Sequence, residues 1–372
     1  MTTSSKITLN VFHIGGGGLD IGPAETLFKL KNIHINLYIF ELRQREESHV
    51  AVSKIESKSG IDVFKVPFGI SNSEKSAKFN INKFPLSSSL YDPSLLSSTD
   101  CPNFSGLIDG VSTPVKSWGE NTTLDRQIEV SLIDLDKLIR GGVVPEPDFL
   151  SMDIQGGEFD ALVGAKEALN RNVLGVVTEV EFFEIYKDQP LYHDQARILD
   201  EFSFRLVDIP GFQKWFPGPA IGTGFATVAE PIFIKFAQAH VSSNYGKRVP
   251  ADLSEFSTEK IIKLSLIAYA FQRYSYFYTL LNYLKLSRYN DFDEHSYSIE
   301  LQEYFSSYQK IEKSLVKTRS NPVYLLENPQ AVLTSKRIRF YLMLGKIFSR
   351  LQIQRVLQKI EFESRKGENF KF

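Results

Sequence analysis

Four consecutive glycines at 15–18 follow a short apolar run, and Glu41 closes the next apolar run along the chain. Glycines let a ligand approach the backbone closely, and a carboxylate at a neighbouring strand end can accept hydrogen bonds from both ribose hydroxyls. The pattern therefore predicts a site for an adenosine-containing cofactor. Asp20 and the late position of Gly22 do not fit the fingerprint that binds the NAD pyrophosphate, which disfavours NAD. The alternative is a simple turn and a solvated strand end.

Apolar runs and helical spacing predict the elements that position these residues. Strands and helices alternate over the first two thirds of the chain, which predicts an α/β fold with a mostly parallel, doubly wound sheet. The segment 82–121 is rich in Ser, Pro, Asn, Gly and Asp, which predicts a long loop insertion. The predicted strands are 9–14, 37–40, 62–67, 128–133, 149–153, 174–180, 204–209 and 232–236, and the predicted helices are 22–31, 157–170 and 189–202.

The most specific segment is PDFLSMDIQGGEFDALVGA at 147–165. It resembles the central signature of the FkbM-type methyltransferase family. The resemblance covers about residues 7 to 237 and leaves the C-terminal third unexplained. Its other matching segments are 40–41, 67–71, 87–91, 174–182 and 186–191.

The resemblance implies a class I methyltransferase fold, a Rossmann-like doubly wound sheet that holds S-adenosyl-L-methionine (SAM) at the carboxyl ends of its strands. A hydroxyl group is the usual methyl acceptor. We therefore expect a SAM-dependent O-methyltransferase that acts on a glycan, a sugar or a related hydroxylated metabolite. The residues expected to bind the cofactor are His13, Gly15, Gly16, Gly17, Glu41, Phe68, Gly69 and Asp153.

Four carboxylates are candidates for the base that methylation of a hydroxyl needs. Ligands in open α/β sheets bind where the strand order reverses, so Asp153 is the first candidate. Glu158 is the second, although it could instead stabilise a helix N-terminus. Strand alternation places Glu179 and Glu181 on one face, where one of them would contact the substrate or orient Asp153. The alternative for both is a solvated strand end.

The acceptor side is predicted from small polar and aromatic residues. We expect Ser88, Ser89, Tyr186 and Trp215 to contact the acceptor, with 213–219 as a candidate acceptor loop. Aromatic faces suit stacking on a sugar, although most aromatic residues belong to the core.

Gln155 departs from the family pattern, because an acidic residue is common at this position. The missing carboxylate weakens any case for a metal ion in this loop, and no compact His or Asp cluster stands beside it. We therefore predict metal independence.

Composition excludes several classes of protein. The formal net charge of −1 gives no reason to expect nucleic-acid binding. A single cysteine, Cys101, cannot form an intramolecular disulfide, and the N-terminal residues lack the features of a secretion signal, so we expect a cytoplasmic protein. No apolar run approaches the roughly 20 residues that span a bilayer.

The remaining chain is predicted as a linker at 239–256 and a mainly α-helical region at 257–372. The segment 258–286 is apolar around most of its helical circumference, so we expect neighbouring helices to enclose it. The segment 336–359 contains seven Lys or Arg residues and no Asp or Glu. It could contact an anionic membrane surface peripherally, or pack on neighbouring helices or a second copy of the chain.

An alternative function is a catalytically inactive SAM-like fold that serves as a binding module in glycan or lipid assembly. The retained Glu41 and Asp153 argue against it. SAM binding without methyl transfer to any acceptor would favour it.

Overall fold

The computed structural model describes residues 7–15, 21–42, 60–94, 104–107, 118–217, 225–239 and 250–287, together with Tyr304. The chain divides into two compact units, Met1–Glu300 and Leu301–Phe372. Every described residue except Tyr304 belongs to the first unit.

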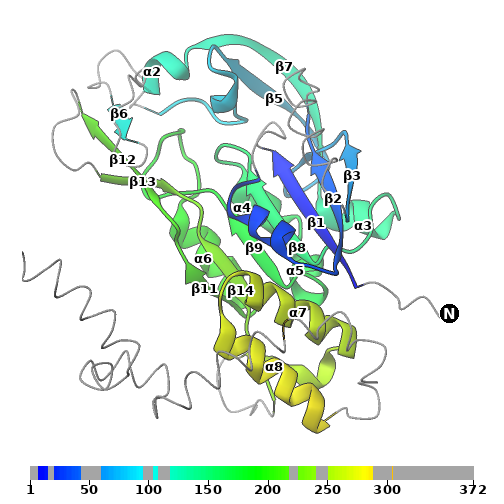
Figure 1. Ribbon diagram of the computed structural model, residues 1–372. Coiled ribbons are helices and arrows are strands. Elements are labelled where there is room, and N and C mark those ends of the chain that lie inside the picture. Colours follow the sequence, from blue (N-terminus) through cyan, green and yellow to red (C-terminus); the bar gives the residue numbers. More distant parts are fainter. Residues whose placement is uncertain are drawn as a thin grey trace, which may run out of the picture. The chain divides into compact units, whose positions relative to one another are not determined.

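A seven-stranded sheet forms the centre of the unit, in the spatial order β11-β14-β9-β8-β1-β2-β3 (Figure 1). All neighbouring strands are parallel except β14, which is antiparallel to both of its neighbours. The predicted α/β fold with a mostly parallel, doubly wound sheet is therefore confirmed. The bounds are β1 (Thr8–Gly15), β2 (His34–Phe40), β3 (Ile61–Val66), β8 (Phe149–Asp153), β9 (Gly175–Thr178), β11 (Phe204–Asp208) and β14 (Ile232–Lys235).

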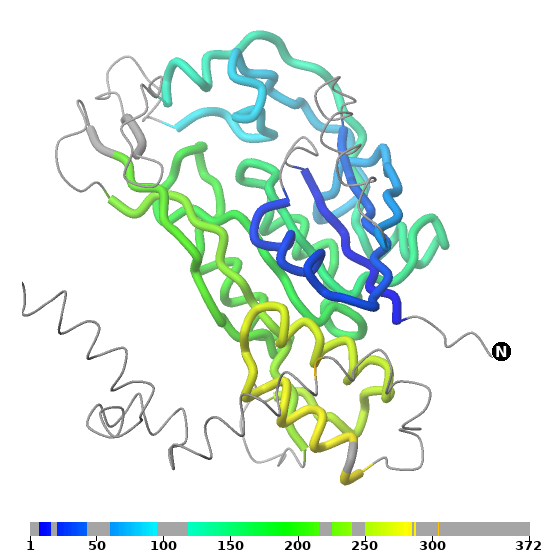
Figure 2. The backbone as a smooth tube through the Cα atoms, in the orientation of Figure 1, coloured from blue at the N-terminus to red at the C-terminus, as the bar shows by residue number. Residues whose placement is uncertain are grey.

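The alternation of side chains along the strands builds a core on both faces of the sheet. On one face, Phe12, Leu150 and Met152 join an apolar cluster that the helices α3 to α6 complete. On the other face, His13 Nδ1 lies 3.1 Å from Ser151 Oγ, which in turn donates to the carbonyl of Ile21 at 3.2 Å. Figure 2 shows the segment that follows Ile21, η2 (Gly22–Lys29), in front of β1. The helices of the first face are α3 (Leu135–Arg140), α4 (Glu158–Val163), α5 (Lys166–Arg171) and α6 (Tyr192–Glu201).

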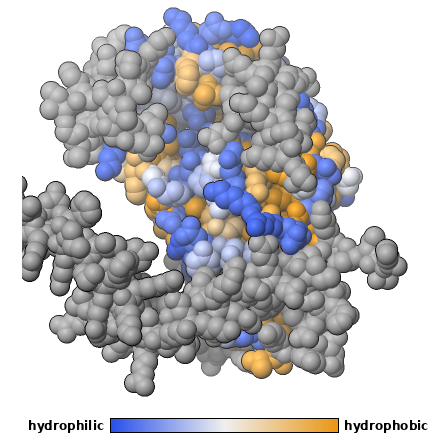
Figure 3. Space-filling view, in the orientation of Figure 1, coloured by the Kyte–Doolittle hydropathy of each residue, from blue (hydrophilic) through white to orange (hydrophobic). Residues whose placement is uncertain are grey.

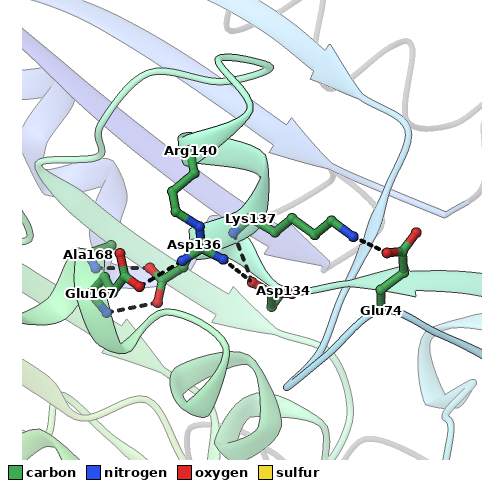
Figure 4. A network of polar contacts seen from close by, with 7 residues as sticks. All are labelled: Glu74, Asp134, Asp136, Lys137, Arg140, Glu167 and Ala168. Carbon is green, nitrogen blue, oxygen red and sulfur yellow. Dashed lines mark hydrogen bonds and ion pairs between the residues drawn. The ribbon is translucent and has the colours of Figure 1, made fainter.

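Short acidic side chains fix the junction between α3 and α5. Asp134 caps α3 by accepting a hydrogen bond from the amide of Lys137 at 2.8 Å. Asp136 accepts from the amides of Glu167 and Ala168 at the start of α5, at 2.8 and 2.9 Å (Figure 4). These contacts satisfy amide groups that have no partner within a helix, and so hold α5 against α3.

Two smaller sheets lie beyond the carboxyl ends of the main strands (Figure 1). One is antiparallel, in the order β10-β13-β12-β6, and the other has the order β4-β7-β5. The elements of this region are β4 (Gly69–Ile70), β5 (Lys75–Asn82), η3 (Pro85–Ser87), β6 (Phe104–Leu107), α2 (Trp118–Asn121), β7 (Leu124–Ile133), β10 (Val180–Glu181), β12 (Phe212–Pro217) and β13 (Phe225–Ala229).

Several element predictions need correction. The predicted strand 128–133 belongs to β7, outside the main sheet, because its exposed polar residues suit an antiparallel sheet with one solvated face. The predicted helix 22–31 is a 3-10 helix, and 157–170 breaks at Gly164, where a Cβ would lie 2.0 Å from the carbonyl oxygen of Ser71. The predicted insertion 82–121 contains η3, β6 and α2 rather than loop alone.

The apolar segment 258–286 forms two helices rather than one, α7 (Thr258–Ala270) and α8 (Tyr274–Ser287), with a turn between them where Gln272 has φ +61°. The ring of Phe271 stacks on that of Phe149 at 5.7 Å, and Lys263 Nζ lies 3.1 Å from Asp148 Oδ2. These helices therefore pack on the main sheet within the first unit.

The predicted linker is described at its two ends, where β15 (Ala237–Gln238) pairs with β16 (Ala251–Asp252), followed by η5 (Leu253–Glu255). The basic segment 336–359 lies outside the described residues, so its contact with a membrane or a second copy stays a prediction. Among the described residues, no helix combines the length and the apolar character needed to cross a membrane.

In the space-filling view, pale and hydrophilic residues occupy the middle of the visible face, between hydrophobic areas (Figure 3).

Candidate functional site

The carboxyl ends of β1, β2 and β8 meet at one edge of the sheet. Gly15 pairs with Asp153 across β1 and β8, and Ile14 pairs with Phe40, so that Glu41 follows one position later at the same edge. Gly15 has φ +90°, and a Cβ there would lie 2.0 Å from the carbonyl oxygen of Asp153. Only glycine fits this position. Gly16 and Gly17 lie outside the described residues.

The other predicted cofactor residues extend this edge towards β3. The backbone amides of Glu41 and Phe68 both donate to the carbonyl of Val66, at 3.3 and 2.9 Å. Gly69 packs so closely that a Cβ would lie 2.6 Å from Leu132 Cδ2. The structure thus brings the described part of the predicted cofactor set together along one sheet edge. His13 is buried within β1, two residues before Gly15.

A hydrogen-bonded group of side chains lies where β8 ends. Gln155 Nε2 donates to Asp153 Oδ1 at 2.8 Å and to Glu179 Oε2 at 2.6 Å. The hydroxyl of Tyr186 lies 2.9 Å from Gln155 Oε1 and 2.9 Å from the carbonyl of Ser87, so its single proton can serve one of them at a time. Burial, followed by the charges of Asp153 and other carboxylates, raises the pKa of Glu179 well above its ordinary value.

Glu158 supports the loop rather than facing solvent. Its side chain is fully buried, and its two oxygens accept hydrogen bonds from the amides of Ile154 and Gly156 at 2.6 and 2.9 Å. Burial raises the pKa of Glu158 to about 7, against the effect of these hydrogen bonds. These contacts favour the capping role over the catalytic one.

We predict that Glu158→Gln weakens the dependence of thermal stability on pH. A carboxyl whose pKa is raised by folding stabilises the native state at low pH, and this contribution is lost as the pH rises through the folded-state pKa of about 7. The Tm of the wild type should therefore fall from about pH 5 to about pH 8, and that of the variant should fall less. Glu167→Gln, at an exposed carboxyl that pairs with Arg140, is the control. Equal slopes in all three proteins would contradict the prediction.

Glu181 is separated from Glu179, which corrects the expectation that both lie on one face of one strand. The chain leaves the main sheet at Glu179, and β10 pairs instead with β13, where Glu181 lies opposite Val228. Glu181 is fully buried, and the side chain of Gln189 lies beside it. Burial raises its pKa well above the ordinary value. A neutral, supporting carboxyl fits this position better than a base.

A cavity of about 290 Å³ opens beside Asp153 and Glu179. Its walls come from the start of η2, the connection between β11 and β12, and the end of β13. Sequence reasoning missed Glu230, whose Oε1 would lie 2.2 Å from a Cβ on Gly22. The sequence pattern gave little indication of this role, because Glu230 lies in a tight turn between β13 and β14 and belongs to no motif. The lining residues are Gly22, Asp153, Glu179, Pro210, Gly211, Phe212, Gln213, Val228, Ala229 and Glu230.

The four predicted acceptor contacts, Ser88, Ser89, Tyr186 and Trp215, are buried, and none of them lines this cavity. Ser88 Oγ accepts from the amide of Asn82 at 3.2 Å, and Ser89 Oγ donates to the carbonyl of Gln155 at 2.6 Å. The rings of Tyr186 and Trp215 both pack on Trp118. Their burial favours a supporting role over direct contact with the acceptor, whereas Gln213, from the predicted acceptor loop, does line the cavity.

One oxygen each of Asp153, Glu158 and Glu179 lies within 4.8 Å of the others, a spacing that a divalent cation could bridge. The hydrogen bonds argue for a different use. Both Glu158 oxygens accept from loop amides, and the Gln155 amide donates to the other two carboxyls. Four of the six oxygens of these carboxyl groups therefore already accept a hydrogen bond.

Part of the chain is similar to one known family of methyltransferases. A family model described as the methyltransferase FkbM domain matches residues 65–206. A crystal structure of a methyltransferase FkbM from Methylobacillus flagellatus is 12% identical, and the matched region covers 61% of this chain and 43% of that chain. The TM-score of this match is 0.28. No curated protein matches the sequence significantly.

Proposed function

We propose that this chain, whose residues 65–206 match the methyltransferase FkbM domain, uses SAM to methylate a hydroxyl of a glycan, a sugar or a related hydroxylated metabolite. The observation that carries this proposal is the position of Asp153. It ends β8 directly opposite the glycine that ends β1, and it lines a cavity together with Glu179.

The residues at the sheet edge suit SAM. Gly15 has no side chain, which lets the end of β1 lie directly against the backbone of Asp153 and Ile154, so the ends of β1 and β8 come together at the proposed cofactor edge. Glu41, one strand away, is placed to accept hydrogen bonds from ribose hydroxyls. The sheet order reverses beside β1, and ligands of open α/β sheets bind at such a point.

When bound, SAM supplies an electrophilic methyl group on a positively charged sulfonium. Asp153 Oδ1 accepts from Gln155, which leaves Oδ2 to take the proton of the acceptor hydroxyl as its oxygen is methylated. The raised pKa of Glu179 favours its protonated form, which reduces repulsion between the two carboxyls. Phe212 and the β11–β12 connection narrow the cavity, and so help to hold the acceptor oxygen in line.

The lining of the cavity favours a hydroxylated acceptor. Asp153, Glu179 and Glu230 offer carboxyl oxygens, which accept hydrogen bonds from neighbouring hydroxyls. Phe212 offers an apolar face, and its side chain is 42% exposed, enough to contact a sugar ring.

The test is transfer of a labelled methyl group from SAM to a panel of glycans and free sugars. We expect label in at least one acceptor, in a form that resists mild alkali, because an ether survives conditions that hydrolyse a methyl ester. Label in an alkali-labile ester would contradict hydroxyl methylation. Saturable SAM binding with no transfer to any acceptor would instead support the inactive binding module.

A further inference from the structure

The side-chain amide of Gln155 lies between two carboxyl groups. Its nitrogen is 2.8 Å from Asp153 Oδ1 and 2.6 Å from Glu179 Oε2, so each of its two hydrogens points to a carboxyl oxygen. Both distances lie at or just below the short end of the usual range for N–H···O hydrogen bonds. One neutral group thus joins two acidic side chains that arise from different strand ends.

The two carboxyl contacts set the orientation of this amide. Gln155 Oε1 then lies 2.9 Å from the hydroxyl of Tyr186, which can donate to it. The opposite orientation would place the amide oxygen against two carboxyl oxygens and lose both donated hydrogen bonds. The network therefore allows one assignment of nitrogen and oxygen.

The backbone of Gln155 is held as firmly as its side chain. Gln155 has φ +58°, in the left-handed region, and its carbonyl accepts from Ser89 Oγ at 2.6 Å. The next residue, Gly156, is flanked by the rings of Tyr91 and Tyr186, each 3.4 Å from the position of a Cβ. A non-glycine residue with positive φ costs about 1 kcal/mol or more, which the surrounding contacts offset.

Several carboxyl groups gather around the amide of Gln155. Asp153, Glu158 and Glu179 bring oxygens within 4.8 Å of one another, and Glu230 adds a fourth carboxyl to the cavity wall. None of the lining residues is Lys, Arg or His. The hydrogens of the Gln155 amide are positive partial charges that lie between Asp153 and Glu179.

We infer that the side-chain amide of Gln155 takes the place of a bound cation. Gln155 is thus a positioning residue that holds the carboxyl groups of Asp153 and Glu179 together. The inference goes beyond the proposed methyl transfer, since it concerns what holds the carboxyl pair whether or not a methyl group is transferred. Replacing the amide with a carboxylate should remove both donated hydrogen bonds and create a demand for a real cation.

The test is thermal unfolding of Gln155→Glu at about pH 8 with and without Mg²⁺, Ca²⁺ or Mn²⁺. Without a divalent cation, the Tm should fall by about 5 °C, because a new carboxylate faces two others. Millimolar Mn²⁺ or Ca²⁺ should restore most of this loss in the variant and leave the wild type unchanged. Gln213→Glu is the matched control, because it adds a carboxylate to an exposed position of the same cavity.

A purely structural role for Gln155 would be shown by a loss of stability that no cation restores and that Gln155→Ala reproduces, and this would overturn the inference. An unchanged Tm in Gln155→Glu would do the same. If the variant does not fold, calorimetric titration of the wild type with Mn²⁺ still decides the matter. Absence of binding supports the inference, and binding that Glu179→Gln abolishes overturns it.

Discussion

Replacing Gly15 with alanine is expected to abolish SAM binding and to lower the free energy of unfolding by about 3 kcal/mol or more. The new Cβ would lie 2.0 Å from the carbonyl oxygen of Asp153 and 2.4 Å from Ile154 Cγ2, with φ at +90°. The backbone of β1 must then move away from β8, which shifts both the cofactor edge and the carboxyl pair. Chemical denaturation and calorimetric titration with SAM measure the two effects.

Gly142→Ala is the matched control for this substitution. Gly142 also has positive φ, at +67°, but a Cβ there would meet nothing within 4 Å. It should therefore show the backbone cost alone, about 1 kcal/mol, with normal SAM binding. Equal losses of stability in the two variants would contradict the prediction, because they would mean that a Cβ on Gly15 does not clash with the carbonyl oxygen of Asp153.

Asp153→Asn should reduce the rate of methyl transfer by about 10²-fold to 10⁴-fold, the range typical for loss of a general base. The asparagine oxygen can still accept from Gln155, so the loop should keep its fold and SAM affinity should change little. The measurement is the rate at saturating SAM with an acceptor found in the glycan screen.

Glu158→Gln is the comparison for that experiment, because Glu158 accepts loop amides and does not line the cavity. Its effect on the rate should be small beside that of Asp153→Asn. If both variants lose the same activity, Asp153 acts through the loop rather than as a base.

The sequence contained enough information for the main sheet and for the strand ends that carry Gly15, Glu41 and Asp153. These strands are short, apolar and closed by glycine or acid, so periodicity located them within one or two residues, apart from the start of β2, which lies three residues earlier. Parallel strands have their carboxyl ends at the same edge of the sheet. The sequence could therefore also predict that Gly15, Glu41 and Asp153 lie at one edge.

Other features depend on pairing that no local pattern records. The break at Glu179, which separates it from Glu181, arises because β10 pairs with a strand some fifty residues later. Ser89 and Tyr186 looked like exposed acceptor contacts, yet their polar atoms are used by Gln155 and its loop. Gln155 was noticed only as a missing carboxylate. The structure shows the two hydrogen bonds that its amide donates.

The measurement that tests the central claim most directly is calorimetric titration of the purified wild type with SAM and with S-adenosylhomocysteine, beside Glu41→Ala as the control. We expect saturable binding of both ligands in the wild type, and loss of most of that affinity in a variant that keeps the wild-type Tm. No binding by the folded wild type would contradict a SAM-dependent methyltransferase, and unchanged affinity in Glu41→Ala would contradict the ribose contact at the end of β2.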